Sequence, residues 1–399
     1  MTALRFVAAQ LARRPLQTAL SVLLLALGVA TLVFVLLVQA QLARSLTRDA
    51  EGVDMVVGAK GSPLQLILSA VYHVDVPTGN VPLAAVAQLR ANRLVRSAIP
   101  VALGDNHRGF RIVGTERALI DHYGGRLAQG ALWQDKLQAV IGAEVARSTG
   151  LTVGAQFFGA HGLAADGPVH EDAPYRVVGV LAPTGTVLDR LLLADLRSVW
   201  FVHEGEALDA QERRILEQAR EVTAVLVQYA SPLAAAIVPR QVNAEPNLMA
   251  AVPANEVARL FAVVGVGIDT MRVFAAVLFG AALLALFVAL MNALEERRYD
   301  IAILRLLGAS RARVAGLLLL EAWLLAAAAA LLGLLLGLAA VAAVAAALAQ
   351  ARSFPLSPFL WSAAVPGVLL LALAVATAAA ALPAWRASRM PLHDALAQG

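Results

Sequence analysis

The sequence predicts an α-helical membrane protein with four transmembrane helices and an extracytoplasmic mixed α/β domain between helices 1 and 2. Three observations predict this fold class. Apolar residues make up 59% of the 399 residues, and the mean hydropathy is +0.71, whereas ordinary soluble domains are about half apolar. Four apolar stretches are long enough to cross a bilayer, which takes about 20 residues. A long region of ordinary polarity separates the first stretch from the other three.

Long runs without charged residues set the spans. Nothing charged lies between Arg14 and Arg44, or between Arg272 and Glu295. The expected spans are 16–40, 272–294, 313–349 and 357–385. The alternative is a set of buried helices in a large soluble domain, but such helices rarely run this far without charge.

Basic residues indicate the orientation of the spans. They are Arg5, Arg13 and Arg14 before the first span, Arg297, Arg298, Arg305, Arg311 and Arg313 between the second and third, and Arg386 and Arg389 after the fourth. Cytoplasmic loops are enriched in Lys and Arg. Both termini, 1–15 and 386–399, are therefore expected in the cytoplasm, and residues 41–271 outside it. Glu321 lies near the cytoplasmic start of the third span. Ionisable residues inside a membrane usually have a function, but this residue is close enough to the interface that we expect a structural role.

The outer region reads as mixed α/β. Short β-branched segments predict strands at 53–57, 111–113, 139–141, 175–181 and 222–229. Residues 144–149 and 209–220 predict helices, and 188–202 is ambiguous between strand and helix. Residues 41–50 and 255–270 continue the first and second spans outward, and we expect them to form a stalk.

A short amphipathic helix is expected between the second and third spans. Ile301, Leu304 and Leu307 lie three residues apart and predict an apolar stripe. Gly308 suits a helix end, and Ser310 suits the cap of the next helix. A solvated loop is the alternative, but an apolar stripe needs something to cover it.

Residues 295–310, Glu-Glu-Arg-Arg-Tyr-Asp-Ile-Ala-Ile-Leu-Arg-Leu-Leu-Gly-Ala-Ser, resemble the signature of the MacB/FtsX-like ABC transporter permease family. That family includes macrolide exporters, the cell-division permease FtsX and the lipoprotein-release permeases LolC and LolE. Further resemblances are Arg13-Arg14-Pro15-Leu16, Ala26-Leu27-Gly28-Val29-Ala30, Glu321, Gly333, Gly337, Pro383-Ala384, Ala387-Ser388-Arg389, Pro391 and Ala395-Leu396. The resemblance is weaker in the outer region, and 58–82 departs from the better-known members.

The resemblance implies that 295–312 forms a coupling helix that docks in a groove of an ABC ATPase. The implied coupling residues are Glu296, Arg297, Arg298, Asp300, Ile301, Leu304, Arg305, Leu307 and Gly308. Gly333 and Gly337 are expected to allow close helix–helix packing.

No G-x-x-x-x-G-K-(S/T) phosphate loop occurs in the sequence. We therefore expect a non-catalytic permease subunit that binds no cofactor itself, with ATP and Mg²⁺ on a separate ATPase dimer. The family works as a pair, so a second copy or a homologue of this chain is implied. A membrane-fusion protein or a periplasmic lipoprotein is a further partner to expect. The net charge of +4 gives no strong case for nucleic acid.

The expected function is to transmit ATPase-driven motion to the outer domain, and so to export or extract a hydrophobic substrate or a lipoprotein at the bacterial inner membrane. The alternative is an FtsX-like signal transmitter, which regulates an outer partner without transport. A metal-linked permease is a third alternative that rests on the histidines alone.

Six of the seven histidines lie in the outer region. His203-Glu204 and His170-Glu171-Asp172 place metal-ligating side chains next to one another. Surface histidines beside acids usually bind no metal, and no H-x-x-x-H spacing lies on a convincing helix. The sequence therefore assigns no metal site, and it has no cysteine to supply one.

The segment 58–82 is a candidate contact surface for the substrate or an outer partner. Ser62-Pro63 predicts a helix start, and the residues at helical spacing after it are apolar. The expected contact residues are Leu64, Leu68, Tyr72 and His73. Packing in the core of the outer domain is an equal alternative.

Overall fold

The computed structural model describes residues 5, 7, 11–162, 168–170, 172–204, 216–217, 219–296, 298–351, 356–357, 359 and 362–389. The chain forms two compact units, which we describe separately. One comprises Met1–Leu42, Val263–Ala347 and Leu356–Gly399, and the other Ala43–Ala262 with Leu348–Pro355. We call them the helical unit and the outer unit.

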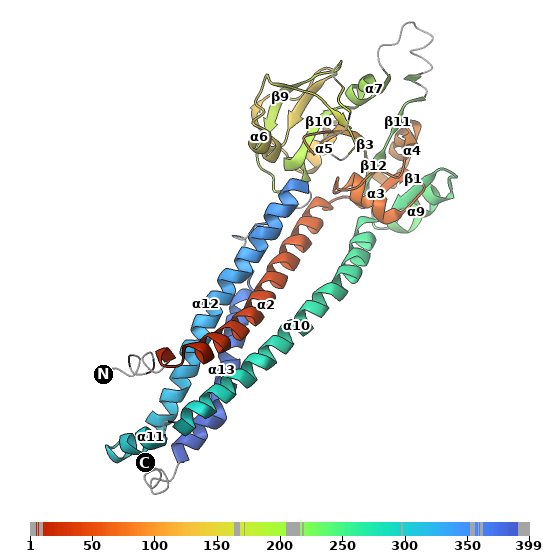
Figure 1. The fold of residues 1–399 in the computed structure, drawn as a ribbon. Helices are drawn as coiled ribbons and strands as arrows, with labels where there is room; N and C mark the ends of the chain where they lie inside the picture. The colour runs from red at the N-terminus through yellow and green to blue at the C-terminus, as the bar shows by residue number, and fades with distance from the viewer. Residues whose placement is uncertain are drawn as a thin grey trace. The chain divides into compact units, whose positions relative to one another are not determined.

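Among the residues that the structure describes, four helices are long and apolar enough to span a membrane, in agreement with the predicted number. They are α2 (Pro15–Asp49), α10 (Pro253–Glu296), α12 (Arg311–Ala351) and α13 (Val365–Arg389) (Figure 1). Each carries apolar side chains that point away from the protein, among them Leu16, Val277, Leu331 and Leu370. A helix that is apolar all round is typical of contact with lipid. The short helix α11 (Arg298–Leu306) connects α10 to α12.

The core of the helical unit contains many small residues. Ala26, Val29, Ala326, Ala329, Ala372 and Ala376 belong to one buried cluster. Gly333 and Gly337 of α12 lie directly against α2: a Cβ atom on Gly333 would come within 2.6 Å of the carbonyl oxygen of Ala26, and one on Gly337 within 3.0 Å of that of Ala30. The glycine pair therefore packs α12 against α2 of the same chain, because only a residue without a side chain allows this approach.

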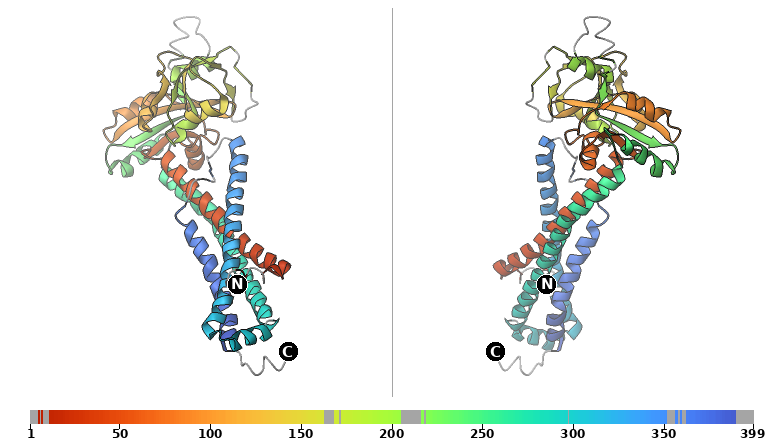
Figure 2. Two further views of the ribbon diagram at one scale, coloured as in Figure 1. Left: turned by 90° about the vertical axis from the view of Figure 1, so that its left-hand side faces the viewer. Right: turned by 90° about the vertical axis from the view of Figure 1, so that its right-hand side faces the viewer.

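Both expected stalk segments are parts of long helices. α2 continues to Asp49 and α10 begins at Pro253, so 41–50 and 255–270 follow without a break from the first span and into the second (Figure 2). Each of these two helices contributes residues to both units.

The outer unit is a mixed sheet with helices, as predicted. Its main strands follow the order β13-β1-β12-β3-β4-β10-β6-β9-β5. Their bounds are β1 (Met55–Ala59), β3 (Val95–His107), β4 (Phe110–Thr115), β5 (Leu127–Gly130), β6 (Gln138–Ile141), β9 (Tyr175–Leu181), β10 (Leu191–Asp195), β12 (Ala224–Tyr229) and β13 (Leu248–Ala251). The pairs β10–β4 and β6–β9 are parallel, and the other neighbours in this order are antiparallel. The short strands β7 (Gln156–Phe157) and β8 (Ala160–His161) join β9 and β3, and β2 (Val81–Pro82) pairs with β11 (Glu221–Val222).

The helices of the outer unit are α3 (Pro63–Ala70), α4 (Ala84–Ala91), α5 (Ala118–His122), α6 (Ala143–Thr149), α7 (Leu196–Glu204) and α9 (Ala234–Ala244), with a 3₁₀ turn at Val187–Arg190. The ambiguous segment 188–202 is both strand and helix, since β10 passes directly into α7. Most of the expected helix 209–220 lies outside the described residues. The long strand β3 was not predicted, because Pro100, Gly104 and Asn106 interrupt its pattern; a register shift between Leu103 and Asn106 accommodates the irregularity.

Candidate functional site

One side of α11 is anchored to the chain's own spans. Ile301 is 8% exposed and packs in a cluster with Leu294 of α10, Val314 and Leu318 of α12, and Ala384 and Ala387 of α13. This contact joins α11 to the ends of three long helices. Within the chain, part of the predicted stripe is therefore covered at Ile301, and a role of this residue in coupling to an ATPase stays a prediction.

Another part of α11 presents apolar residues to solvent. Leu307 is 80% exposed, Leu306 59% and Tyr299 48%, while Leu304 is half-buried. The predicted stripe divides because three residues advance about 300° around a helix, so each step falls about 60° short of a full turn. Leu307 therefore lies about 120° around the axis from Ile301. The same spacing gives one anchored residue and one exposed residue.

Backbone hydrogen bonds fix the end of α11. Gly308 has a φ of +95°. Its N–H donates to the Arg305 carbonyl (3.1 Å), and the Ala309 N–H donates to the Leu304 carbonyl (3.0 Å). These two bonds are the Schellman motif, in which glycine tolerates the left-handed conformation. The Ser310 hydroxyl then accepts from the Arg313 N–H (3.3 Å) at the start of α12. The turn therefore holds Leu306 and Leu307 in one position.

The charged coupling residues lie along α11 and just before it. Glu296 forms an ion pair with Arg14, which lies just before α2, and the Arg298 guanidinium donates to Glu295 (2.7 Å). Asp300 is exposed. Arg297 lies outside the described residues, and Arg305 is half-buried.

The outer end of α2 is fixed by four polar contacts within the outer unit, which we call the α2 joint. The Tyr72 hydroxyl donates to the Leu46 carbonyl (3.0 Å), and the Tyr123 hydroxyl donates to the Asp49 carbonyl (2.7 Å). Arg190 pairs with the buried Asp49 carboxylate (3.2 Å), and Arg48 donates to the Gly185 carbonyl (3.0 Å). Burial lowers the pKa of Arg190, and Asp49 opposes this effect.

The segment 58–82 contributes mainly to the core and to this joint. Ser62 caps α3 as predicted, accepting from the Gln65 N–H. The fully buried apolar residues of α3 are Leu66, Ile67 and Ala70, while Leu64 and Leu68 are partly exposed. Tyr72 is 2% exposed, so for this residue the structure favours the alternative of packing in the core. Its ring completes the core and its hydroxyl belongs to the α2 joint.

His73 follows Tyr72 in a left-handed backbone conformation, with a φ of +57°. Its Nδ1 atom is buried and has no hydrogen-bond partner among the described residues. Burial lowers the pKa of His73 to about 3, and the positive charges of Arg111 and Arg190 act in the same direction. The imidazole is therefore neutral at physiological pH.

The outer unit also has an open cleft of about 880 Å³. Arg90, Arg117 and Arg197 line it together with Trp133 and Trp200. Glu116 and Asp195 in the same wall pair with Arg90 (2.7 Å) and Arg197 (2.9 Å). These ion pairs offset part of the positive charge of the three arginines. The surface of the cleft is therefore partly polar and partly aromatic, without a strong net charge.

The structure brings together three histidines, two of which stand beside acidic residues in the sequence. His161, His170 and His203 meet at the carboxylate of Asp105. Glu171 lies outside the described residues. The four residues come from separate parts of the chain, so no local spacing could have identified the group.

Two family models match the chain. Residues 18–245 match the MacB-like periplasmic core domain, and residues 272–392 match the FtsX-like permease C-terminal domain. No curated protein matches.

Solved structures with similarity to the outer region include the periplasmic region of MacB from Actinobacillus actinomycetemcomitans, at 12% identity and a TM-score of 0.34, covering 54% of this chain and 95% of that one. The extracellular domain of the noncanonic ABC-type transporter YknZ from Gram-positive bacteria is also similar, at 12% identity and a TM-score of 0.31, covering 49% and 98%. The first of the two family matches extends over more than half of the 399 residues. The chain therefore belongs to the MacB/FtsX-like family of ABC transporter permeases.

Proposed function

We propose that this chain is a non-catalytic permease subunit that receives motion from a separate ABC ATPase at α11 and transmits it to the outer unit. One observation carries the proposal: α11 holds Tyr299, Leu306 and Leu307 in solvent while Ile301 anchors it to three long helices. An exposed apolar set on a rigid support is suited to bind a partner protein. A load on these side chains would pass directly to the ends of α10, α12 and α13.

Two features provide a path for that motion. α2 and α10 each contribute to both units as continuous helices. The α2 joint ties the last turn of α2 to residues from several loops of the outer unit, so a displacement of α2 pulls on those loops. A helix transmits displacement along its axis because its backbone hydrogen bonds run in that direction.

The partners and the location follow from membership of the family and from the arginines. ATP and Mg²⁺ would bind to the partner ATPase dimer, and the permease would work as a pair with a second copy or a homologue. The arginines around α11 and at both ends of the chain favour a cytoplasmic position for α11 and both termini in a bacterial inner membrane. The transported class would be a hydrophobic substrate or a lipoprotein, handled outside the membrane.

Because the chain has no cysteine, its orientation can be tested by single labelling sites. Leu233→Cys, at an exposed position before α9, should react with a membrane-impermeant thiol reagent on spheroplasts, and Leu307→Cys should react only after permeabilisation. The reverse pattern would contradict the proposed orientation.

The coupling role is tested by Leu307→Asp. The side chain is 80% exposed in this chain, so the substitution should leave expression and melting temperature unchanged. In a docked complex it would bury an unpaired carboxylate, which costs several kcal/mol. We expect at least a tenfold loss of ATPase co-purification and of permease-dependent ATP hydrolysis.

The matched control is Leu233→Asp, the same change at a residue 62% exposed in the outer unit, which should keep both activities. Full ATPase binding and stimulation by the Leu307→Asp variant would exclude α11 as the docking site. Measuring substrate release in the same membranes separates transport from the signalling alternative, in which ATP hydrolysis is coupled but nothing is moved.

A further inference from the structure

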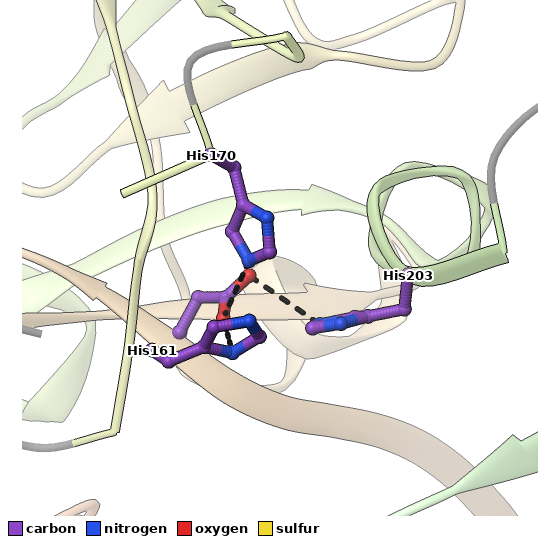
Figure 3. Close-up of side chains that lie close together, drawn as sticks. His161, His170 and His203 are labelled. Carbon is purple, nitrogen blue, oxygen red and sulfur yellow. Dashed lines mark ion pairs between the residues drawn. The ribbon is translucent and has the colours of Figure 1, made fainter. Parts of the chain in front are cut away.

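The outer unit contains a cluster of three imidazoles around one carboxylate, which we call the His₃Asp cluster (Asp105, His161, His170 and His203). His161 Nδ1 lies 3.2 Å from Asp105 Oδ1, His170 Nε2 lies 3.6 Å from the same oxygen, and His203 Nε2 lies 3.5 Å from Asp105 Oδ2. Figure 3 shows the three labelled rings directed at the one carboxylate. One nitrogen or oxygen from each residue lies within 4.8 Å of all the others.

Three separate segments supply these side chains. Asp105 lies on β3 and His161 on β8, where the two residues are paired in antiparallel register. His170 follows the bridge between Ala160 and Val169, and His203 lies in the last turn of α7. The cluster is therefore a product of the fold and not of a local sequence motif.

Backbone contacts hold the segment that carries His161 and His170. The Asn106 side chain donates to the carbonyls of Ala160 (3.1 Å) and Gly162 (3.0 Å). The His170 N–H donates to the Gly159 carbonyl (2.9 Å), and the Arg111 guanidinium donates to the Gly162 carbonyl (3.0 Å). These bonds fix the backbone that carries His161 and His170.

The cluster leaves buried polar atoms unsatisfied. Asp105 is 3% exposed. Its Oδ1 atom and Nε2 of His170 are buried and make no hydrogen bond within the described part of the chain. Burying a polar atom without a partner costs free energy, and burying a carboxylate without compensation costs more. A cation between these atoms would satisfy both.

We propose that the His₃Asp cluster binds a divalent transition-metal ion of the zinc type. Imidazole nitrogen and carboxylate oxygen are ligands of Zn²⁺, which takes four of them in a tetrahedron at about 2.0–2.2 Å. Ligand atoms at that distance are about 3.3–3.6 Å apart. His161 Nδ1 and His170 Nε2 lie 3.2 and 3.6 Å from Asp105 Oδ1, close to this separation, and His203 Nε2 lies 3.5 Å from the other oxygen, Oδ2.

The ligand set indicates what kind of site this is. Four protein ligands fill a tetrahedral coordination sphere, as in structural and binding sites, whereas catalytic zinc sites keep a position for water. The side chains of His161 and His203 are 46% and 36% exposed, so the ion can exchange with the surroundings. Bound metal would connect the end of α7 to β3 and to the segment that ends at His170. The inference concerns the outer unit alone and does not depend on the coupling role of α11.

The test is direct metal binding by the full-length protein in detergent. After treatment with a chelator and removal of the chelator, the protein is titrated with Zn²⁺, and bound metal is measured by elemental analysis after gel filtration. We expect one Zn²⁺ per chain and a higher melting temperature with metal, because an ion that binds only the folded state stabilises it. Co²⁺ in place of Zn²⁺ should give the intense visible absorption of a tetrahedral site.

The informative variant is the His161→Gln/His203→Gln double substitution, which changes the two most exposed ligands. It should weaken Zn²⁺ binding at least 100-fold and abolish both the rise in melting temperature and the Co²⁺ absorption. The matched control is His107→Gln, a histidine on the same strand as Asp105 that should leave all three measurements unchanged. Metal-free melting temperatures of both variants verify that they fold.

If the metal-free double variant melts early, His203→Gln alone serves in its place, since a single ligand loss should still weaken binding at least tenfold. Failure of the wild-type protein to retain stoichiometric metal would overturn the proposal. So would retention of the same binding and the same Co²⁺ spectrum after removal of these ligands.

Discussion

Helices α3 and α11 are both short and both carry apolar residues at helical spacing, yet they have different environments. α3 buries Leu66 and Ile67 completely in the outer unit. α11 buries Ile301 against the spans and leaves Leu306 and Leu307 in solvent. The comparison shows that an apolar stripe predicts a helix but does not determine whether the chain itself covers that stripe. The neighbours of the helix decide, and sequence spacing does not reveal them.

The largest expected difference between the two helices is in stability. Leu66→Ala should lower the free energy of unfolding by about 2–5 kcal/mol, because it opens a cavity in a packed core. Leu307→Ala, on the exposed part of α11, should change it by less than about 0.5 kcal/mol. Melting temperature of the purified protein, followed by tryptophan fluorescence, measures both. Equal losses would mean that the α11 surface is also packed.

A smaller expected effect is a pH dependence of the free energy of unfolding, which comes from the region of α3. The pKa of His73, just after α3, is lowered to about 3 in the folded protein, while an unfolded histidine titrates near 6.5. Below pH 6.5 the unfolded chain binds the extra proton first, so His73 removes stability as the pH falls from 6.5 towards 3. Between pH 6.5 and 5 the loss approaches about 2 kcal/mol.

His73→Asn should reduce this acid sensitivity, since asparagine does not titrate and tolerates the left-handed backbone that His73 adopts. The measurement is the change in melting temperature between pH 7 and pH 5 for both proteins. An identical change in the variant would show that His73 does not control the acid response.

The smallest effect concerns the two tyrosines. Tyr72→Phe removes the hydroxyl that donates to the Leu46 carbonyl in the α2 joint, and a single such hydrogen bond contributes about 0.5–1.5 kcal/mol. Tyr299→Phe makes the same change on the exposed part of α11 and should have no measurable effect on stability. If both variants melt alike, the Tyr72 hydroxyl does not stabilise the α2 joint.

The sequence predicted the features that depend on composition or on a special residue. Four spans follow from apolar length, and Gly308, Ser310 and Ser62 marked helix ends that the structure places at the same residues. It failed where the outcome depends on distant neighbours. The hydroxyl of the buried Tyr72 donates to a carbonyl of α2, which lies far from it in the sequence. The His₃Asp cluster forms because β3 pairs with β8, next to α7. β3 itself was missed because proline, glycine and asparagine disturb its alternation.

The contact of Gly333 and Gly337 with α2 limits the degrees of freedom of the bundle. At Gly333 the two backbones are too close to admit even a methyl group. Rotation of α12 about its own axis would bring the side chain of Leu332 or Leu334 into the space occupied by Ala26 and Val29, and the helices would have to separate. The glycine pair thus opposes independent rolling of α12 against α2, so that these two helices are expected to turn together or not at all.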